Sequence, residues 1–278
     1  MLVPKIIHQI FIDKNALPDV FLQNIINIKK LNNDWDHRLY DDDDIIKFIS
    51  ENYSPNIIAN FHAINPLYSA ARADFFRYLL MLKVGGVYLD IKSTVTKKLD
   101  DVLLKDDTYI LSNWVNRKGD LYEGYGIFPE LPSRGEYQQW HIISVPHHPF
   151  LKEVVSTVTQ NIESYNPSRN GVGFLGVMRT TGPIAYTLAI ERIQKHNRFR
   201  LVNIEDLGFK YSTLATRSDR HAHERFYSGK HFSDLRDPLI LREFRDVDGN
   251  VLDLSKMRRN ALCPCGSGER IKHCHGMS

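Results

Sequence analysis

The chain alternates between short apolar runs of strand length and longer segments whose apolar residues recur at helical spacing. Runs rich in β-branched residues predict strands, and apolar residues three and four positions apart predict helices with one buried face. The predicted strands cover residues 4–12, 37–40, 87–91, 109–114 and 141–146. The predicted helices cover residues 17–32, 41–53, 69–86, 148–165 and 180–196.

This order of strands and helices predicts an α/β domain with a nucleotide-binding layout, in which ligands bind beyond the carboxyl ends of the strands. At 278 residues, with 42% apolar and 25% charged residues, the chain is long enough for one domain and a small appendage. The net charge of +3 is too small to indicate nucleic acid, which we do not expect as a partner.

The N-terminal residues lack the basic leader and apolar stretch of a signal peptide, and no segment approaches the roughly 20 apolar residues that cross a bilayer. We therefore expect a cytoplasmic protein, with peripheral attachment to the inner face of the membrane as the alternative.

A run of four aspartates, Asp41 to Asp44, precedes the second predicted helix. Asp41 or Asp42 can cap that helix, and the other carboxylates then lie in its first turn, near the positive end of its dipole. The run could instead bind a metal ion. Consecutive helical residues point in different directions, so the capping interpretation is favoured.

The stretch VGGVYLDIKS, residues 84–93, carries the candidate chemistry. Side chains alternate along a strand, so Tyr88, Asp90 and Lys92 are expected on one face and the apolar residues between them on the other. Asp74 and Arg77 are spaced i, i+3 on the preceding helix, which the double glycine turns back beside the strand. An ordinary intrahelical ion pair is the alternative for these two residues.

The segment ARADFFRYLLMLKVGGVYLDIKS, residues 71–93, resembles the core signature of glycosyltransferase family 32, the DxD-motif sugar transferases. The segments PKIIHQIFI, HRLYDDDDI and RTTGPIAY match the same family, and the resemblance covers roughly residues 3–195. It implies a GT-A type, Rossmann-like fold, a nucleotide-sugar donor and retention of the anomeric configuration.

The resemblance also implies roles for individual residues. Asp74 and Arg77 would contact the donor, Tyr88 would line the sugar site, and Asp90 would contact the metal ion or the ribose. Phe11 stands where the family commonly has a tryptophan that stacks on the base. The predicted substrate-binding residues are Phe11, Asp74, Arg77, Tyr88, Asp90, Lys92, Gly182 and Pro183.

Lys92 departs from the family pattern because it replaces the second aspartate of the DxD motif. Cleavage of a nucleotide sugar leaves negative charge on the diphosphate, which a metal ion or an ammonium group can stabilise. Manganese or magnesium held by Asp90, His231 and the donor phosphates is one solution, and Lys92 acting directly on the diphosphate is another. A third possibility is that Asp90 and Lys92 pair and leave an inactive site. We expect an active enzyme with Asp90 and Lys92 as catalytic residues.

All three cysteines lie within the last sixteen residues, which fits a reducing compartment and a metal site better than a secreted disulfide scaffold. The pattern C-x-C-x8-C-H offers three thiolates and an imidazole, a set that suits structural zinc, with His273 as a competing ligand. This tail resembles the SEC-C motif, which implies zinc on Cys263, Cys265, Cys274 and His275. Such a closed site is expected to dock a protein or a membrane surface, and an ordinary soluble tail is the alternative.

The predicted organisation is thus a transferase domain at 1–240, a connecting segment at 241–259 and a SEC-C type tail at 260–278. The predicted function is transfer of a sugar to a saccharide or lipid-linked acceptor, and the resemblance suggests surface polysaccharide biosynthesis. The alternatives are a non-catalytic adaptor that binds a sugar nucleotide or glycan, and a toxin-like protein glycosyltransferase.

Overall fold

A computed structural model describes residues 1–227, 231–241, 257–264 and 268–274. Its centre is a six-stranded sheet in the order β2-β1-β3-β6-β5-β7. The pairs β1–β2, β1–β3 and β5–β7 are parallel, and β6 pairs antiparallel with β3 and β5. The strands are β1 (Ile6–Ile10), β2 (Asp36–Tyr40), β3 (Gly86–Leu89), β5 (Tyr109–Leu111), β6 (His141–Ser144) and β7 (Arg200–Leu201).

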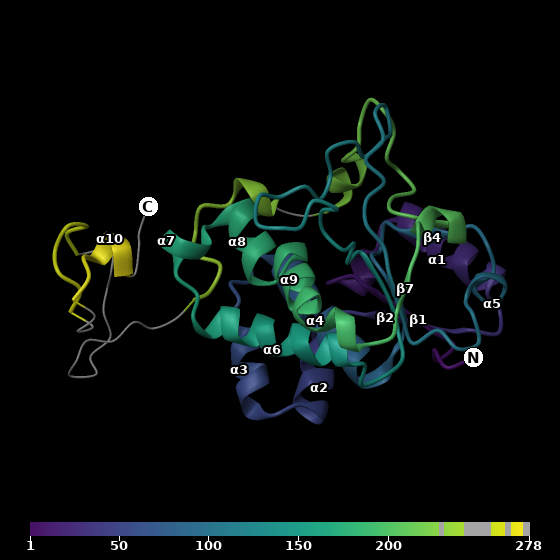
Figure 1. The fold of residues 1–278 in the computed structure, drawn as a ribbon, viewed down its shortest axis with the longest axis horizontal. Coiled ribbons are helices and arrows are strands. Elements are labelled where there is room, and N and C mark those ends of the chain that lie inside the picture. The colour runs from purple at the N-terminus through teal and green to yellow at the C-terminus, as the bar shows by residue number, and fades with distance from the viewer. Residues whose placement is uncertain (228–230, 242–256, 265–267, 275–278) are drawn as a thin grey trace.

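Helices cover both faces of this sheet, and a two-stranded antiparallel sheet of β4 (Thr94–Val95) and β8 (Phe209–Lys210) lies beside it (Figure 1). The α-helices are α1 (Asp19–Leu31), α2 (Asp42–Asn52), α3 (Pro55–Ala63), α4 (Ser69–Val84), α5 (Leu99–Val102), α6 (Pro149–Glu163), α7 (Pro167–Asn170), α8 (Gly173–Thr180), α9 (Pro183–Ile193) and α10 (Ile271–Cys274). The 3-10 helices are η1 (Lys14–Ala16), η2 (Gln194–His196), η3 (Ile204–Leu207), η4 (Ala222–Phe226) and η5 (Phe232–Asp234). The mixed α/β sheet confirms the predicted fold class.

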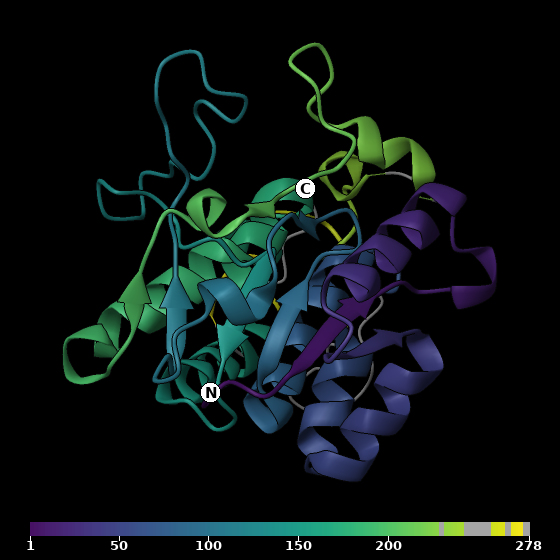
Figure 2. The ribbon, with the colours of Figure 1, turned by 90° about the vertical axis from the view of Figure 1, so that its right-hand side faces the viewer.

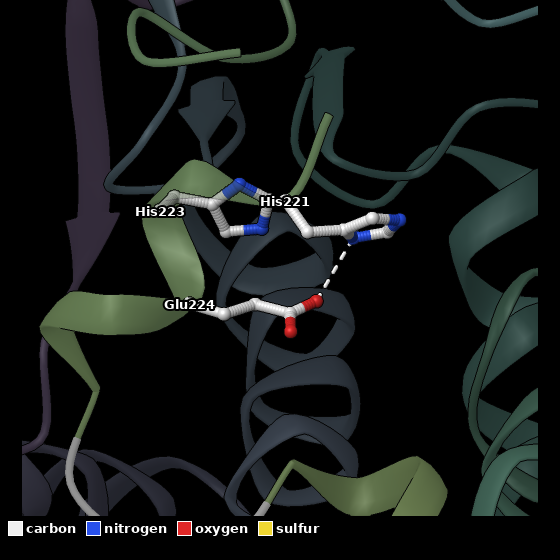
Figure 3. Close-up of side chains that lie close together, drawn as sticks. All are labelled: His221, His223 and Glu224. Atoms are coloured by element: carbon white, nitrogen blue, oxygen red, sulfur yellow. Dashed lines mark ion pairs between the residues drawn. The ribbon is translucent and has the colours of Figure 1, made fainter. Parts of the chain in front are cut away.

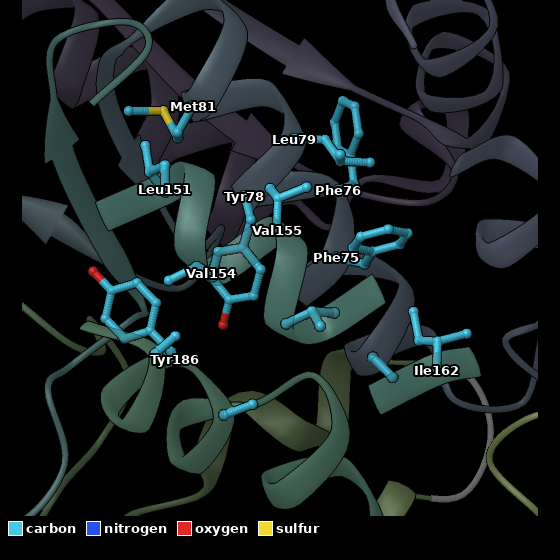
Figure 4. Packing of buried hydrophobic residues seen from close by; sticks show 14 of the residues in the cluster. Phe75, Phe76, Tyr78, Leu79, Met81, Leu151, Val154, Val155, Ile162 and Tyr186 are labelled. Atoms are coloured by element: carbon cyan, nitrogen blue, oxygen red, sulfur yellow. The ribbon is translucent and has the colours of Figure 1, made fainter. Parts of the chain in front are cut away.

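The α4 helix lies in the middle of the larger core. Its residues from Asp74 to Met81 are all buried, because α6 packs along α4 and Tyr186 of α9 stacks on Tyr78 (Figure 4). A helix that is apolar on nearly every side is buried on nearly every side, and its few polar residues must then find partners inside the protein. The Asp74 and Arg77 side chains are such residues.

Gly85 turns the chain from α4 directly into β3. Its φ of 67° lies in the region that favours glycine, and a Cβ there would approach the Pro146 nitrogen to 2.6 Å. The turn leaves no room for a longer loop, so α4 and β3 lie next to one another. This is the arrangement that the glycine pair predicts.

The aspartate run caps α2, as the capping interpretation predicted. The Asp41 carboxylate accepts a hydrogen bond from the Asp44 amide, and the Asp44 carboxylate accepts one from the Asp41 amide. Asp42 pairs with Arg72 at 3.2 Å. These contacts give the run a structural role at the start of the helix.

The β3 strand ends at Leu89, so the alternation of side chains along a strand does not extend to Lys92. The Ser93 amide donates to the Asp90 carbonyl at 2.8 Å, so residues 90–93 form a tight turn. Lys92 does lie beside Asp90, but the expectation that strand alternation places it there is wrong, because the turn does. The same turn sends Ile91 into a small core with Phe21 and Ile25.

Long loops rise beyond the carboxyl ends of β1 and β3 (Figure 2). Residues 113–136 form one of them and residues 211–221 another, and the two meet where Tyr125 hydrogen-bonds His221 at 2.9 Å. Among the described residues no helix is both long and apolar enough to span a bilayer.

The described part of the C-terminal tail forms a small hairpin beside α7. Leu262 bridges to Arg270, and the Cys263 amide donates to the Glu269 carbonyl at 2.7 Å. The α10 helix lies against α7, and Ser168 donates to the Lys272 carbonyl at 2.7 Å. This places the tail at the end of the molecule opposite the labelled strands (Figure 1).

Candidate active site

The carboxyl end of β3 and the middle of α4 bring four of the predicted residues together. The Arg77 guanidinium lies 3.2 Å from the Asp74 carboxylate and 3.2 Å from the Asp90 carboxylate, so it bridges the two acids. Its Cζ also lies over the Tyr88 ring, 4.7 Å from the ring centre. The i, i+3 pair on α4 is thus part of a larger charged cluster.

Asp90 is saturated with partners in this structure. Its Oδ1 accepts a hydrogen bond from the Tyr88 hydroxyl at 3.0 Å, and its Oδ2 accepts one from Lys92 at 3.1 Å. Burial by itself raises the pKa of Asp90, but Arg77 and Lys92 outweigh it and hold the pKa below its ordinary value. The carboxylate is therefore ionised at neutral pH and already neutralised by two cations.

Lys92 is held on two sides. Its ammonium pairs with Asp90 and lies 4.5 Å from the centre of the Tyr211 ring. Burial lowers the pKa of Lys92, while Tyr211 and Asp90 raise it, and the balance leaves it well above its ordinary value. A permanent positive charge thus stands where the family pattern has a second carboxylate.

Asp74 lies deeper than Asp90 and is 4% exposed. The Gln139 amide donates to its Oδ1 at 3.1 Å, and the Thr181 hydroxyl donates to its Oδ2 at 3.1 Å. Burial, with Asp90 adding to it, raises the pKa of Asp74 to about 6 against the opposing effect of Arg77. Because its oxygens are all engaged inside the protein, Asp74 positions Arg77.

Asp74→Asn is expected to change how stability depends on pH. The pKa of Asp74 is raised from 3.8 to about 6, so between these values the folded state holds more protons and the free energy of unfolding falls as pH rises. The variant lacks this pH dependence. The free energy of unfolding of the variant minus that of wild type should therefore increase by about 2 kcal/mol between pH 4.5 and pH 7.5. Urea titrations at the two pH values measure this.

The exposed Asp106, which pairs with Arg198 on the surface, offers a matched control for that experiment. Asp106→Asn should follow the wild type at both pH values. A difference between Asp74→Asn and wild type that stays constant with pH would contradict the raised pKa.

Gly182 and Pro183 are buried at the start of α9. A Cβ at Gly182 would approach the Met178 Cα and the Val177 carbonyl oxygen to 3.0 Å, so the glycine lets α8 and α9 come together. Direct contact with a donor, which the resemblance implies, does not fit this burial. Gly182 and Pro183 instead follow Thr181 directly and hold it where its hydroxyl donates to Asp74.

Phe11 lies at the rim of the site in an aromatic cluster. Its ring centre is 6.1 Å from that of Phe21 and 6.4 Å from that of Tyr227, which directly follows η4. Phe226 contacts the same group through Phe21. A cluster of tilted aromatic rings therefore surrounds Phe11, where the resemblance puts the base.

The predicted His231 belongs to a group of side chains with His221, His223 and Glu224, which Tyr211 separates from Lys92. Its Nε2 is 3.5 Å from the Glu224 carboxylate, and that carboxylate is 2.8 Å from His221 Nδ1 (Figure 3). His223 belongs to the same group and is 5% exposed. Burial, and then the charge of Lys92, lower the pKa of His223 to about 3, so its ring is neutral.

The β3 turn does not fit a divalent ion of the DxD kind. Such an ion needs carboxylate oxygens with free lone pairs, and the Asp90 carboxylate has Arg77, Lys92 and Tyr88 against it. A divalent cation would also stand within a few ångströms of two fixed positive charges. The expectation that Asp90 and His231 share a metal ion therefore lacks support in this geometry.

The zinc set of the tail lies mostly outside the described residues. Cys265, His275 and the side chain of Cys274 fall outside them, and Cys263 is described and buried. The backbone bond between Cys263 and Glu269 folds the segment back on itself, which is what bringing distant ligands together requires.

Several residues at the site were missed in the sequence analysis. They come from loops without a periodic pattern, although His-Ala-His-Glu at 221–224 puts three metal-ligand side chains within four residues and is a usable signal. The missed residues are Gln139, Tyr211, His221, His223, Glu224 and Tyr227.

Two family models match this chain. Residues 18–109 match the glycosyltransferase sugar-binding region containing the DXD motif, and this region includes α4, β3 and Asp90. Residues 259–276 match the SEC-C motif. The predicted recognition of a DxD-type sugar transferase region with a SEC-C tail is confirmed.

The curated relatives include mannosyltransferases from fission yeast. The initiation-specific α-1,6-mannosyltransferase of Schizosaccharomyces pombe is 29% identical over 193 residues, covering 64% of this chain and 46% of the relative. Inositol phosphoceramide mannosyltransferase 2 of the same organism is 25% identical, covering 69% of this chain and 48% of the relative. The chain thus spans about half the length of the curated relatives that it matches.

A solved structure with a similar fold is the PaToxG glycosyltransferase, with a TM-score of 0.50 and 16% identity over 70% of each chain. At this identity the likeness concerns the fold. It confirms the predicted GT-A type architecture.

Proposed function

We propose that the protein is a retaining glycosyltransferase that moves a sugar from a nucleotide-sugar donor to a saccharide or lipid-linked acceptor, in surface polysaccharide biosynthesis. The observation that carries this proposal is the Asp74, Arg77, Tyr88 and Asp90 cluster at the carboxyl end of β3, inside the region that matches the sugar-binding family. The yeast relatives transfer mannose, which supports a hexosyl donor.

In this proposal the leaving diphosphate lies beside Lys92. The bond between the sugar carbon and the diphosphate oxygen breaks with its electron pair on that oxygen, and the acceptor oxygen bonds to the same carbon while its proton passes to the departing diphosphate. The Lys92 ammonium stabilises the charge that develops on the diphosphate. Asp90 and Tyr211 hold the ammonium in place before the donor binds. Asp74 and the Gln139 carbonyl hold Arg77 in place, and its guanidinium also pairs with Asp90.

A panel of nucleotide sugars tests this function with the full chain. The cognate donor should raise the melting temperature, since a ligand that binds the folded state stabilises it by mass action, and should release nucleoside diphosphate when an acceptor is present. If none of the donors stabilises the protein, the assignment of the donor site is wrong.

A second candidate function is a non-catalytic adaptor that binds a sugar nucleotide or glycan. The direct Asp90–Lys92 pair at 3.1 Å favours it, because the pair would have to open or shift for Lys92 to meet a phosphate. Stabilisation by a donor without release of nucleoside diphosphate, from any acceptor or from water, would identify this alternative.

We further propose that the tail binds one structural zinc ion through Cys263, Cys265, Cys274 and His275 and docks a protein or a membrane surface. The SEC-C match and the buried, folded-back Cys263 support it. Four protein ligands close the coordination shell, so the tail would have no open position for chemistry.

Cys274→Ser is expected to reduce the zinc content of the purified protein from one equivalent to near zero, because a tetrahedral site loses one of its thiolates. Elemental analysis after a brief wash with a weak chelator measures this. His273→Ala is the matched control, since it removes a neighbouring imidazole, and it should keep the zinc. Undiminished zinc in Cys274→Ser would refute the assignment.

A further inference from the structure

Three metal-ligand side chains meet on one short element near Lys92. His221 precedes η4, and His223 and Glu224 belong to it; one ligand atom of each lies within 4.8 Å of those of the other two (Figure 3). The match to the sugar-binding family ends at residue 109, well before this group. The group is also separate from the cysteine tail.

The spacing within the group is close to what one ion requires. Two ligands that each lie about 2.1 Å from a tetrahedral ion are about 3.4 Å apart. His221 Nδ1 and the Glu224 carboxylate are 2.8 Å apart, and His231 Nε2 is 3.5 Å from the same carboxylate oxygen. These two separations lie on either side of that value, and the ligand atom of His223 lies within 4.8 Å of those of His221 and Glu224.

The partners of these side chains leave a binding role open. His223 is 5% exposed, and its Nδ1 is buried without a hydrogen-bond partner among the described residues. Buried polar groups are normally paired, so an unpaired imidazole nitrogen calls for a ligand or a water molecule. The Tyr125 hydroxyl contacts His221 Nε2 at 2.9 Å, the kind of outer contact that orients a ligating histidine.

The group also borders the site described above. The His223 ring centre is 6.2 Å from that of Tyr211 and 6.3 Å from that of Tyr227, and Tyr211 is the ring that Lys92 lies over. One aromatic side chain thus separates the histidines from the lysine.

We propose that His221, His223 and Glu224, with His231 beside them, bind a divalent transition-metal ion next to the candidate donor site. The position beside a donor rests on the proposed function, whereas the metal binding does not. Lys92 takes the place of a metal ligand in the turn after β3. In this proposal the segment that carries His221, His223 and Glu224 supplies a metal site instead.

The ligand types restrict the ion. Two or three imidazoles with one carboxylate suit ions from manganese to zinc, while magnesium prefers oxygen ligands and keeps its water. His221 and Glu224 have side chains that are 57% and 33% exposed, so positions on the ion would remain open to water or a phosphate oxygen. Manganese is the practical probe, because the cysteine tail would take up added zinc.

The test is a manganese titration of the full chain without donor, followed by electron paramagnetic resonance of the free ion. Wild-type protein, isolated with its tail metal in place, should bind one equivalent of manganese and bind magnesium much more weakly. His223→Ala and Glu224→Gln should each weaken manganese binding by at least about tenfold. His196→Ala removes an exposed histidine elsewhere and should bind as wild type does.

Two results would overturn the proposal. One is manganese binding in Glu224→Gln and His223→Ala that equals that of wild type, and the other is magnesium binding as tight as manganese binding. Because Glu224 is partly exposed, Glu224→Gln should fold even if His223→Ala does not. Donor-induced stabilisation, measured separately, shows whether the proposed transferase function stands when the metal site fails, or the reverse.

Discussion

Asp90→Asn should reduce release of nucleoside diphosphate by about 100-fold or more. Asparagine keeps the shape of the side chain and can still accept a bond from Tyr88, but it removes the negative charge that balances Arg77 and Lys92. Preorganised charge at the reacting bond is commonly the largest single contribution to catalysis, so its loss should appear in kcat. Steady-state assays with the cognate donor measure it.

The same variant should be less stable, because removing one partner of a buried charge pair costs about 3–5 kcal/mol. Activity must therefore be measured well below the melting temperature of the variant, with circular dichroism to show that it is folded. Asp106→Asn, on the surface, should keep both the stability and the activity of wild type. Unchanged turnover in folded Asp90→Asn would remove Asp90 from the mechanism.

Lys92→Met tests whether an ammonium group replaces the second carboxylate of the family pattern. Methionine nearly fills the same buried space and packs well on Tyr211, so the main change is the loss of charge. We expect kcat to fall by about 10²–10³, with a smaller change in KM, because the charge on the leaving diphosphate develops in the transition state.

Lys92→Arg keeps the charge and should recover part of the activity that Lys92→Met loses. A chelator should lower wild-type activity only in part, since the lysine does not depend on a metal ion. Full dependence of wild type on added manganese, together with normal turnover in Lys92→Met, would contradict a role for the lysine at the diphosphate.

The sequence predicts the elements around the cluster well because their signals are local. Apolar spacing marks α4, the two glycines mark its end, and the i, i+3 spacing of Asp74 and Arg77 predicts that they are neighbours. These features depend on residues within a few turns of one another, which is the range over which sequence patterns act.

The other wall of the site depends on contacts between distant residues. Ser93 donates to the Tyr211 carbonyl at 2.6 Å, and the Thr213 amide donates to the Lys92 carbonyl at 2.9 Å. These two bonds hold Tyr211 against Lys92, and the His223 ring lies on the same aromatic side chain. No periodic pattern near residue 211 announces such pairing, so the site residues from this segment could not be predicted from spacing.

The position of Lys92 shows where a prediction from strand periodicity fails. Its neighbourhood was predicted correctly from strand alternation, yet the strand ends three residues earlier and a turn places the side chain. An argument from periodicity holds only where the regular element continues, and the end of a strand is the least predictable part of it.

The position of the tail has a consequence for how the protein could work on a large acceptor. The α10 helix packs on α7, at the end of the molecule opposite the labelled strands (Figure 1). A partner held there would leave the loops around Lys92 uncovered and pointing outward. Tethering of this kind raises the local concentration of an acceptor carried by that partner, so a weak acceptor site could still be used efficiently.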